Sequence, residues 1–331
     1  MAFPPAAPSP RLSVFDALSA AIDVTGRRLF PFRLDRWFAL GFVAFLDHCG
    51  RGGKGGMQFP GGGNPGRSGG EFGGPDLSGA KDWIGAHVAI ILAVTAIVVV
   101  IVVAFMALAQ WLGSRGTFMY VDNVATGRFD VKRPWSEHAE RAWSYFGWSF
   151  GASLVGLFGI LLLLVPVAFL VIGLFGSGPA LGPILGIVAI VLLIVLFAIA
   201  LGLFQVLLHD FAAPLQWKLG IPCGQALGVA WNLALGHKGT FIGYVLLKIV
   251  FTILFAIASV FAGCFTCCLG FLPVISHTLL QPLHYFERAW SLCLLRQAGY
   301  DLFPPEPAVA PPPALPPPEP PAPPPEPLGA Y

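Results

Sequence analysis

Five stretches of this chain are long, strongly apolar and almost free of charge. They are residues 84–112, 150–175, 181–208, 240–262 and 269–286. Lys248 is their only Asp, Glu, Lys or Arg residue. A hydrocarbon core about 30 Å thick is crossed by about 20 helical residues, and such segments must be helices because lipid cannot pair exposed backbone groups. The sequence therefore predicts an all-α fold, a polytopic transmembrane helical bundle.

The distribution of Lys and Arg predicts how the bundle is oriented, because these residues are enriched on the cytoplasmic side. They cluster before residue 37, in residues 115–141, at the ends of residues 210–239, and after residue 286. The connections 176–180 and 263–268 contain none, which places them outside. Residues 84–112 then run inward, so an inside N-terminus requires the short apolar run at 37–49 to cross as well.

We therefore expect about six crossings of a bacterial cytoplasmic (inner) membrane, with both termini in the cytoplasm. The alternative is five crossings, with a re-entrant first segment and an outside N-terminus. Five tryptophans favour these boundaries, because they fall near the ends of the expected helices, where an interfacial aromatic belt lies. They are Trp37, Trp83, Trp111, Trp143 and Trp148.

Composition divides the chain into three regions. Residues 1–33 form an amphipathic N-terminal segment whose apolar stripe we expect to lie in the headgroups. That stripe consists of Val14, Leu18, Ala21, Ile22 and Leu29. Residues 34–303 form the transmembrane domain, with an outside loop at 50–79 that is too glycine-rich (14 of 30 residues) to form a core. Residues 304–331 include 15 prolines, which predicts a disordered, polyproline-II-like cytoplasmic tail.

Two connections are expected to contain interfacial helices. Residues 222–236 carry an apolar stripe with Trp231 as an anchor. Residues 118–125 are expected to form a second such helix, followed by Gly127 as a C-terminal stop.

The last apolar stretch carries a polar face. His277, Gln281, His284 and Arg288 are spaced by four, three and four residues, so they share one side of a helix, and Pro282 loosens that helix in its middle. Polar groups at membrane depth usually face the bundle interior or a water-filled cavity. One interpretation is a substrate or proton path along this face. The other is a set of hydrogen bonds between helices, with Arg288 simply at the cytoplasmic interface.

Lys248 is a candidate partner of that face, as is Gln205 from a neighbouring helix. It lies eight residues into its stretch, so its long stem could let the ammonium reach the interface. Asp210 and Glu287, near the same surface, are candidate ion-pair partners. The long stretches contain no carboxylate, so we do not expect a proton relay built on paired acids.

Cys264, Cys267 and Cys268 form a Cys-x-x-Cys-Cys cluster in an outside connection. Two of them could form a disulfide in an oxidising compartment, or one could pair with Cys49. Unreacted thiols at the outer interface are the alternative. The cluster lacks the second ligand pair of a zinc site, so no metal site is expected there.

Catalytic motifs are missing from the sequence. It has no nucleophile elbow, no His-Glu-x-x-His, no phosphate-binding loop and no nucleic-acid patch. We expect a non-enzymatic protein with no cofactor, no metal and no nucleic-acid partner. Membrane lipids are the expected partners, the proline-rich tail could dock a protein, and no pattern indicates an oligomeric state.

Two segments carry a family resemblance. They are Trp-Leu-Gly-Ser-Arg-Gly-Thr-Phe-Met-Tyr-Val-Asp-Asn-Val at 111–124 and His-Asp-Phe-Ala-Ala-Pro-Leu-Gln-Trp at 209–217, the latter followed by a short helix around 226–231. Over residues 11–300 the chain resembles uncharacterised bacterial multi-pass proteins that are similar to the membrane domain fused to some glycerophosphodiester phosphodiesterases. The acidic metal-binding residues of the phosphodiesterase itself have no counterpart here, so the resemblance implies no catalytic residue.

The leading hypothesis is therefore a role in envelope organisation or lipid handling. The alternative is a transporter of a small or lipid-like solute that uses the polar face on the last helix.

Overall fold

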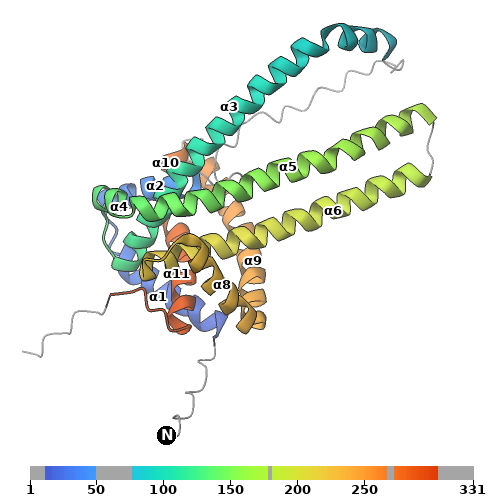
Figure 1. Cartoon of the computed structure of the whole chain (residues 1–331). Helices are drawn as coiled ribbons and strands as arrows, with labels where there is room; N and C mark the ends of the chain where they lie inside the picture. Colours follow the sequence, from blue (N-terminus) through green and yellow to red (C-terminus); the bar gives the residue numbers. More distant parts are fainter. Residues whose placement is uncertain (1–11, 50–76, 178–180, 267–271, 305–331) are drawn as a thin grey trace, which may run out of the picture.

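The computed structural model describes residues 12–49, 77–177, 181–266 and 272–304 (Figure 1). The helices in order are α1 (Val14–Leu29), α2 (Leu34–Cys49), α3 (Leu77–Thr126), α4 (Lys132–Glu137), α5 (Ala139–Ser177), α6 (Leu181–Val206), the π-helix η1 (Leu207–Ala212), α7 (Ala213–Leu219), α8 (Cys223–Gly236), α9 (Lys238–Phe265), α10 (Pro273–Leu279) and α11 (Gln281–Gln297). These residues contain no strand, which confirms the all-α prediction. Most of the expected glycine-rich loop and all but the first residue of the proline-rich tail lie outside the described residues.

Four continuous helical segments are long and apolar enough to cross a membrane. They are Ala86–Thr126, Ala139–Val171, Leu181–Leu219 and Lys238–Phe265. Their large aliphatic side chains point outward: Leu162 and Leu185, for example, are 73% and 65% exposed. A water-soluble protein does not expose apolar surface on this scale, whereas lipid covers it without penalty. The chain is therefore a helical membrane protein.

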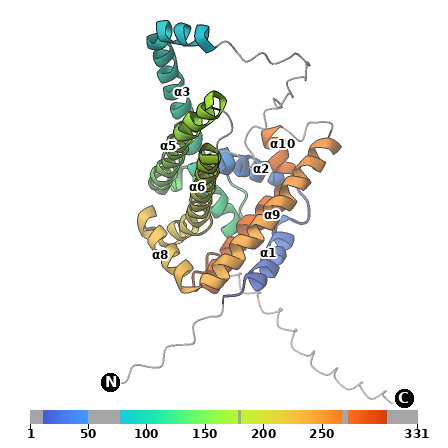
Figure 2. The same ribbon diagram turned by 90° about the vertical axis from the view of Figure 1, so that its right-hand side faces the viewer.

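The long helices project from a more compact base (Figure 1). Helices α5 and α6 pack against each other as an antiparallel hairpin, and α3 contacts α5. The base contains α1, α2, α8, α11 and the last turns of α3, while α9 runs obliquely beside α1 (Figure 2). Most of the largest fully buried side chains belong to this base.

Helix α1 is part of the base, and its apolar stripe does not lie in headgroups as expected. Its buried face consists of Val14, Ala17, Ala21, Val24, Thr25 and Leu29. This face packs on α11, whose Trp290, Leu292 and Leu295 are fully buried. Ile22, expected in the stripe, is exposed. The small residues Ala17 and Ala21 allow a close approach that the bulkier face containing Ile22 does not.

Two glycines allow α2 to pack closely on its neighbours. A Cβ atom at Gly116 of α3 would lie 2.3 Å from the backbone nitrogen of Asp47, and one at Gly41 would lie 2.8 Å from the Cα atom of Thr278 in α10. Only glycine leaves room for backbones at these distances. The end of α2 is thereby held against both α3 and α10.

The expected interfacial helices have different outcomes. A helix forms at α8 as predicted, with Ala226 and Ala230 buried and Trp231 exposed, and its position at the membrane interface stays a prediction. The segment 118–125 is not a separate helix, because it continues α3 without a break and is buried in the base. Gly127 is the predicted stop: its φ is +69°, and its N–H donates to the carbonyl oxygen of Asn123 at 2.9 Å.

Candidate functional site

A π-helical turn interrupts the third long segment where it enters the base. All six residues of η1 are buried. Such turns are rare in proteins. Those that do occur often lie at functional sites, because the extra residue redirects neighbouring side chains. Here the side chains of His209 and Asp210 contact each other, with His209 Nδ1 2.9 Å from Asp210 Oδ1. This pair begins a buried polar cluster that draws on five helices.

The carboxylate of Asp47, at the end of α2, is the first centre of the cluster. Its Oδ2 atom accepts a hydrogen bond from Arg288 Nη2 at 3.0 Å. Its Oδ1 atom accepts one from Thr117 Oγ1 at 2.6 Å and lies 3.0 Å from His209 Nε2. Asp47 and Arg288 are both buried. A buried carboxylate is tolerated only with such partners, and here they come from α3, η1 and α11.

The carboxylate of Asp210 is the second centre. It accepts a hydrogen bond from Tyr244 Oη at 3.0 Å and forms an ion pair with Lys248. Lys248 Nζ also lies 3.0 Å from Glu287 Oε1. Both predicted partners of Lys248 are therefore confirmed. Its side chain does not extend to the interface, because it is buried against these two carboxylates.

The polar face of the last apolar stretch is divided between two helices. The expected single helix breaks at Leu280, so His277 belongs to α10 while Gln281, His284 and Arg288 belong to α11. Pro282 lies in the first turn of α11, a position that proline favours. The helix breaks at Leu280 because a proline in the middle of a continuous helix would remove a backbone hydrogen bond, whereas in a first turn it removes none.

All four side chains of the face are nevertheless buried. Gln281 Nε2 donates to Tyr120 Oη at 3.1 Å, a bond between helices of the kind that one interpretation expected. The rings of His277 and His284 stack at 4.7 Å. Arg288 does not lie at the interface, because it is buried and also donates to the carbonyl oxygen of His209 at 3.0 Å.

Sequence reasoning missed three aspartate or histidine members of the cluster: Asp47, His48 and His209. The ring of His48 lies 4.7 Å from that of His284 and 5.1 Å from that of His277. A signal existed in the sequence, because Asp47-His48 and His209-Asp210 are two aspartate–histidine pairs, each at the end of an apolar stretch. Their 162-residue separation hid the contact between them.

A cavity of about 10 Å³ lies inside the cluster. Its lining residues are Asp47, His48, Tyr120, His209, Asp210, His284, Glu287 and Arg288. This volume accommodates about one water-sized species. The cluster can therefore bind an ion or a water molecule, but not an organic substrate in this conformation.

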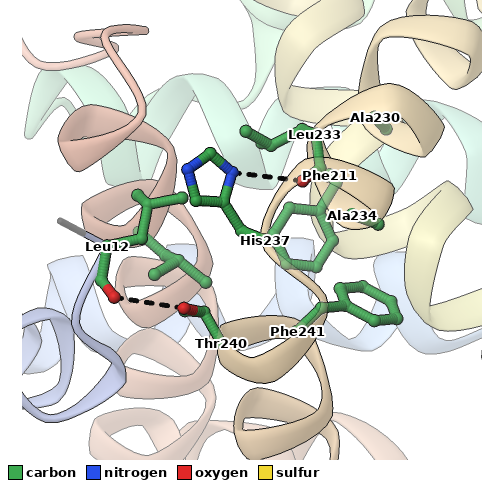
Figure 3. Close-up of a pocket in the computed structure, with 9 residues that line it drawn as sticks. Leu12, Phe211, Ala230, Leu233, Ala234, His237, Thr240 and Phe241 are labelled. Carbon is green, nitrogen blue, oxygen red and sulfur yellow. Dashed lines mark hydrogen bonds between the residues drawn. The ribbon is translucent and has the colours of Figure 1, made fainter. Parts of the chain in front are cut away.

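A second small cavity, of about 20 Å³, lies between the start of α1, α8 and α9 (Figure 3). Its lining is apolar apart from His237 and Thr240. His237 Nδ1 lies 3.4 Å from the carbonyl oxygen of Leu233, and Thr240 Oγ1 donates to that of Leu12 at 3.1 Å. One imidazole among apolar side chains offers no catalytic or metal-binding set, so these bonds serve to join the helices.

A third, larger cavity is a groove of about 620 Å³ on the side of α5 and α6. Its lining residues are Trp143, Ser144, Gly147, Trp148, Gly151, Ala152, Val155, Leu201 and Phe204. A Cβ atom at Gly147 or Gly151 would meet no atom within 4 Å, so the two glycines form the hollow. The four-residue spacing of Gly147 and Gly151 therefore opens a groove, and no second helix in the described part of the chain lies close to either glycine here.

None of the four cysteines in the described part of the chain lines the cavity of the buried cluster. Cys49 is half-buried and Cys264 is exposed, and both are free thiols. Cys267 and Cys268 lie outside the described residues, so the expected disulfide within their cluster stays a prediction. Burial raises the pKa of Cys223 to about 12 and that of Cys293, mainly for the same reason, to about 11.

Of the comparisons with known proteins, the one with protein-family models gives a match. No curated protein and no solved structure is similar enough to match. A model of a family of unknown function, DUF7544, matches residues 12–297, which include every helix of the base and all four long segments. The chain belongs to the DUF7544 family.

Proposed function

We propose that the protein is a non-enzymatic integral protein of the bacterial cytoplasmic membrane that takes part in lipid handling. The observation that carries this proposal is the apolar groove on α5 and α6. The resemblance to membrane domains fused to glycerophosphodiester phosphodiesterases, whose substrates derive from phospholipids, points the same way.

Six crossings are favoured over five by the contacts of the N-terminal residues. The backbone N–H of Ser13 donates to Gln297 Oε1 at 2.9 Å, and the carbonyl of Leu12 accepts from Thr240 Oγ1. The beginning of α1, the beginning of α9 and the end of α11 therefore lie together. A chain that starts and ends on one side crosses an even number of times. With four long segments and the return through α10 and α11, six crossings require α2 as the sixth, as the sequence predicts for residues 37–49.

The position of the groove suits the acyl chain of one membrane lipid. It lies on two segments that are apolar enough to cross the bilayer, and Trp143 and Trp148 stand beside it as interfacial anchors. Its lining offers almost only apolar side chains, with Ser144 as the polar exception, and the Ser144 hydroxyl already accepts from the N–H of Cys223. Such a lining binds hydrocarbon and does not discriminate headgroups.

Filling the groove tests the proposal. A Cβ atom at Gly151 meets no atom within 4 Å, so a leucine there would project into the hollow, whereas a leucine at Gly182, whose Cβ position is equally free, lies outside it. We expect native mass spectrometry of the wild type and of Gly182→Leu to show one retained phospholipid per chain. Gly151→Leu should lose it. Equal lipid retention in Gly151→Leu would refute the groove as the binding site.

Transport of a small solute is a second candidate, and the broken helix at Leu280 favours it. Discontinuous helices near the membrane midplane form substrate sites in many transporters. The 10 Å³ cavity restricts such a substrate to an ion. Replacing His277 and His284 with leucine should abolish ion uptake into proteoliposomes, and unchanged uptake by a folded variant would reject this candidate.

A further inference from the structure

Histidines are concentrated around the cavity of the polar cluster. The chain has seven, and three of them, His48, His209 and His284, line this one small space while a fourth, His277, stacks on His284. The carboxylates of Asp47, Asp210 and Glu287 share the lining. Imidazole and carboxylate together are the usual ligands of divalent transition metals.

We propose that His48, His284 and Glu287 bind one divalent transition-metal ion, with Zn²⁺ as the best fit. The ligand atoms of these three side chains all lie within 4.8 Å of one another. Zn²⁺ bound by two imidazoles, one carboxylate and a water is a common four-coordinate arrangement with bonds of about 2.0–2.2 Å. A small inward movement of the three side chains therefore closes the site.

The helices supply this geometry. His284 and Glu287 are three residues apart in the first turns of α11, so they project from one face of that helix. His48 comes from the last turn of α2. The close packing of α2 at Gly116 and Gly41 holds that turn in place.

Hydrogen bonds already orient two of the ligands. His48 Nδ1 lies 2.8 Å from the carbonyl oxygen of Ala44, which can only accept, so this nitrogen carries the proton. The lone pair is then on Nε2, the arrangement found in most metal-bound histidines. Lys248 Nζ contacts Oε1 of Glu287. A carboxylate has two oxygens, so Glu287 can retain this contact and still bind a metal.

The third ligand, His284, has a buried nitrogen that needs a partner. Its Nδ1 atom has no hydrogen-bond partner among the described residues, and the side chain is buried. The ring is held by the neighbouring rings of His48, His277 and Phe255, at 4.7–4.8 Å. A buried polar atom without a partner is unfavourable. A metal ion bound at this nitrogen would satisfy it.

The charge of the surroundings also favours a cation. Three carboxylates line the cavity, from Asp47, Asp210 and Glu287, whereas the facing cations are Arg288 and Lys248. With neutral histidines, the cluster is one positive charge short of balance. No interaction with the lipid groove is required, so this inference does not depend on the proposed lipid function.

Co²⁺ binding tests the proposal. The full chain is purified in detergent without a polyhistidine tag and is stripped of bound metal with a chelator before Co²⁺ is added. Co²⁺ reports a four-coordinate site through its visible absorption. We expect one Co²⁺ per chain, displaced by Zn²⁺. Each of the three ligand variants should weaken Co²⁺ binding by more than about tenfold: His48→Gln, His284→Gln and Glu287→Gln. Loss of a ligand should lower the metal affinity at least as much as loss of a residue that only hydrogen-bonds to a ligand.

His237→Gln is the matched control. His237, like His48, contacts a carbonyl four residues earlier in the chain, but no second histidine and no acid line its cavity. This variant should bind Co²⁺ as the wild type does. Circular dichroism and gel filtration of each variant establish that it is folded.

X-ray absorption of the Zn²⁺-loaded wild type gives an answer even if a variant fails to fold. The proposal requires two imidazole ligands, oxygen ligands and no sulfur. A sulfur shell would place the ion on the cysteines and overturn it. The absence of saturable binding by the wild type, or wild-type affinity in the three folded ligand variants, would also overturn it.

Discussion

The ion pair between Arg288 and Asp47 should be essential for the stability of the base. Arg288→Met removes one partner of a buried carboxylate and leaves its charge in place. Breaking a buried ion pair from one side costs about 3–5 kcal/mol. Asp47 keeps the hydroxyl of Thr117 and the ring of His209, so we expect a loss near the lower end, about 3 kcal/mol.

A double-mutant cycle isolates the pair. Asp47→Asn alone should also destabilise, because it leaves the Arg288 guanidinium buried without its carboxylate. The double variant removes both charges, so its loss should be smaller than the sum of the single losses by about 2 kcal/mol. Unfolding in mixed micelles, followed by circular dichroism as the fraction of dodecyl sulfate rises, measures these free energies.

The exposed pair between Arg133 and Glu137 is the control. Its two atoms are 3.7 Å apart, and the side chains of Arg133 and Glu137 are 42% and 51% exposed. Glu137→Gln should change the free energy of unfolding by less than about 0.5 kcal/mol. If Arg288→Met cost no more than this control, or if the two single losses simply added, the reasoning about the buried cluster would be refuted.

Two further predictions concern the thiols and the orientation. Burial raises the pKa of Cys223 from 9.0 to about 12, so between these values the unfolded chain loses a proton that the folded chain keeps. The free energy of unfolding should then fall as pH rises through this window, by up to about 1.4 kcal/mol per pH unit. Cys223→Ala should show a shallower decline in detergent unfolding. Parallel declines in the two proteins would contradict the raised pKa of Cys223. An impermeant maleimide should label Cys264 in intact spheroplasts. Lys132→Cys, made without Cys49, Cys264, Cys267 and Cys268, should react only after permeabilisation, and its labelling in intact spheroplasts would reverse the orientation.

Local patterns predicted the elements that depend on nearby residues alone. Helix α8 and the stop at Gly127 match the sequence, because a helix end and an apolar stripe are set by residues within a few turns. The pairing of Lys248 with Asp210 and Glu287 was also accessible, since few carboxylates lie near that level of the chain. The resemblance to membrane domains of phosphodiesterases stays a hypothesis.

Contacts between distant segments were not predictable in this way. The stripe of α1 looked suited to headgroups because an amphipathic pattern has the same periodicity whether lipid or another helix covers it. Only the packing on α11 distinguishes the two. Arg288 looked interfacial for a similar reason, since Asp47, its partner, is 241 residues away.

The sequence by itself determined that this protein lies in a membrane as a bundle of helices. Apolar stretches that are nearly free of charge and long enough to span the bilayer have no other stable conformation in water or in lipid. The tertiary structure alone decided which polar side chains meet. The close approach of α2 at Gly116, the π-turn at His209 and the break at Leu280 together bring His48, His284 and Glu287 to one cavity. Such a meeting depends on the relative positions of whole helices, which no local pattern encodes.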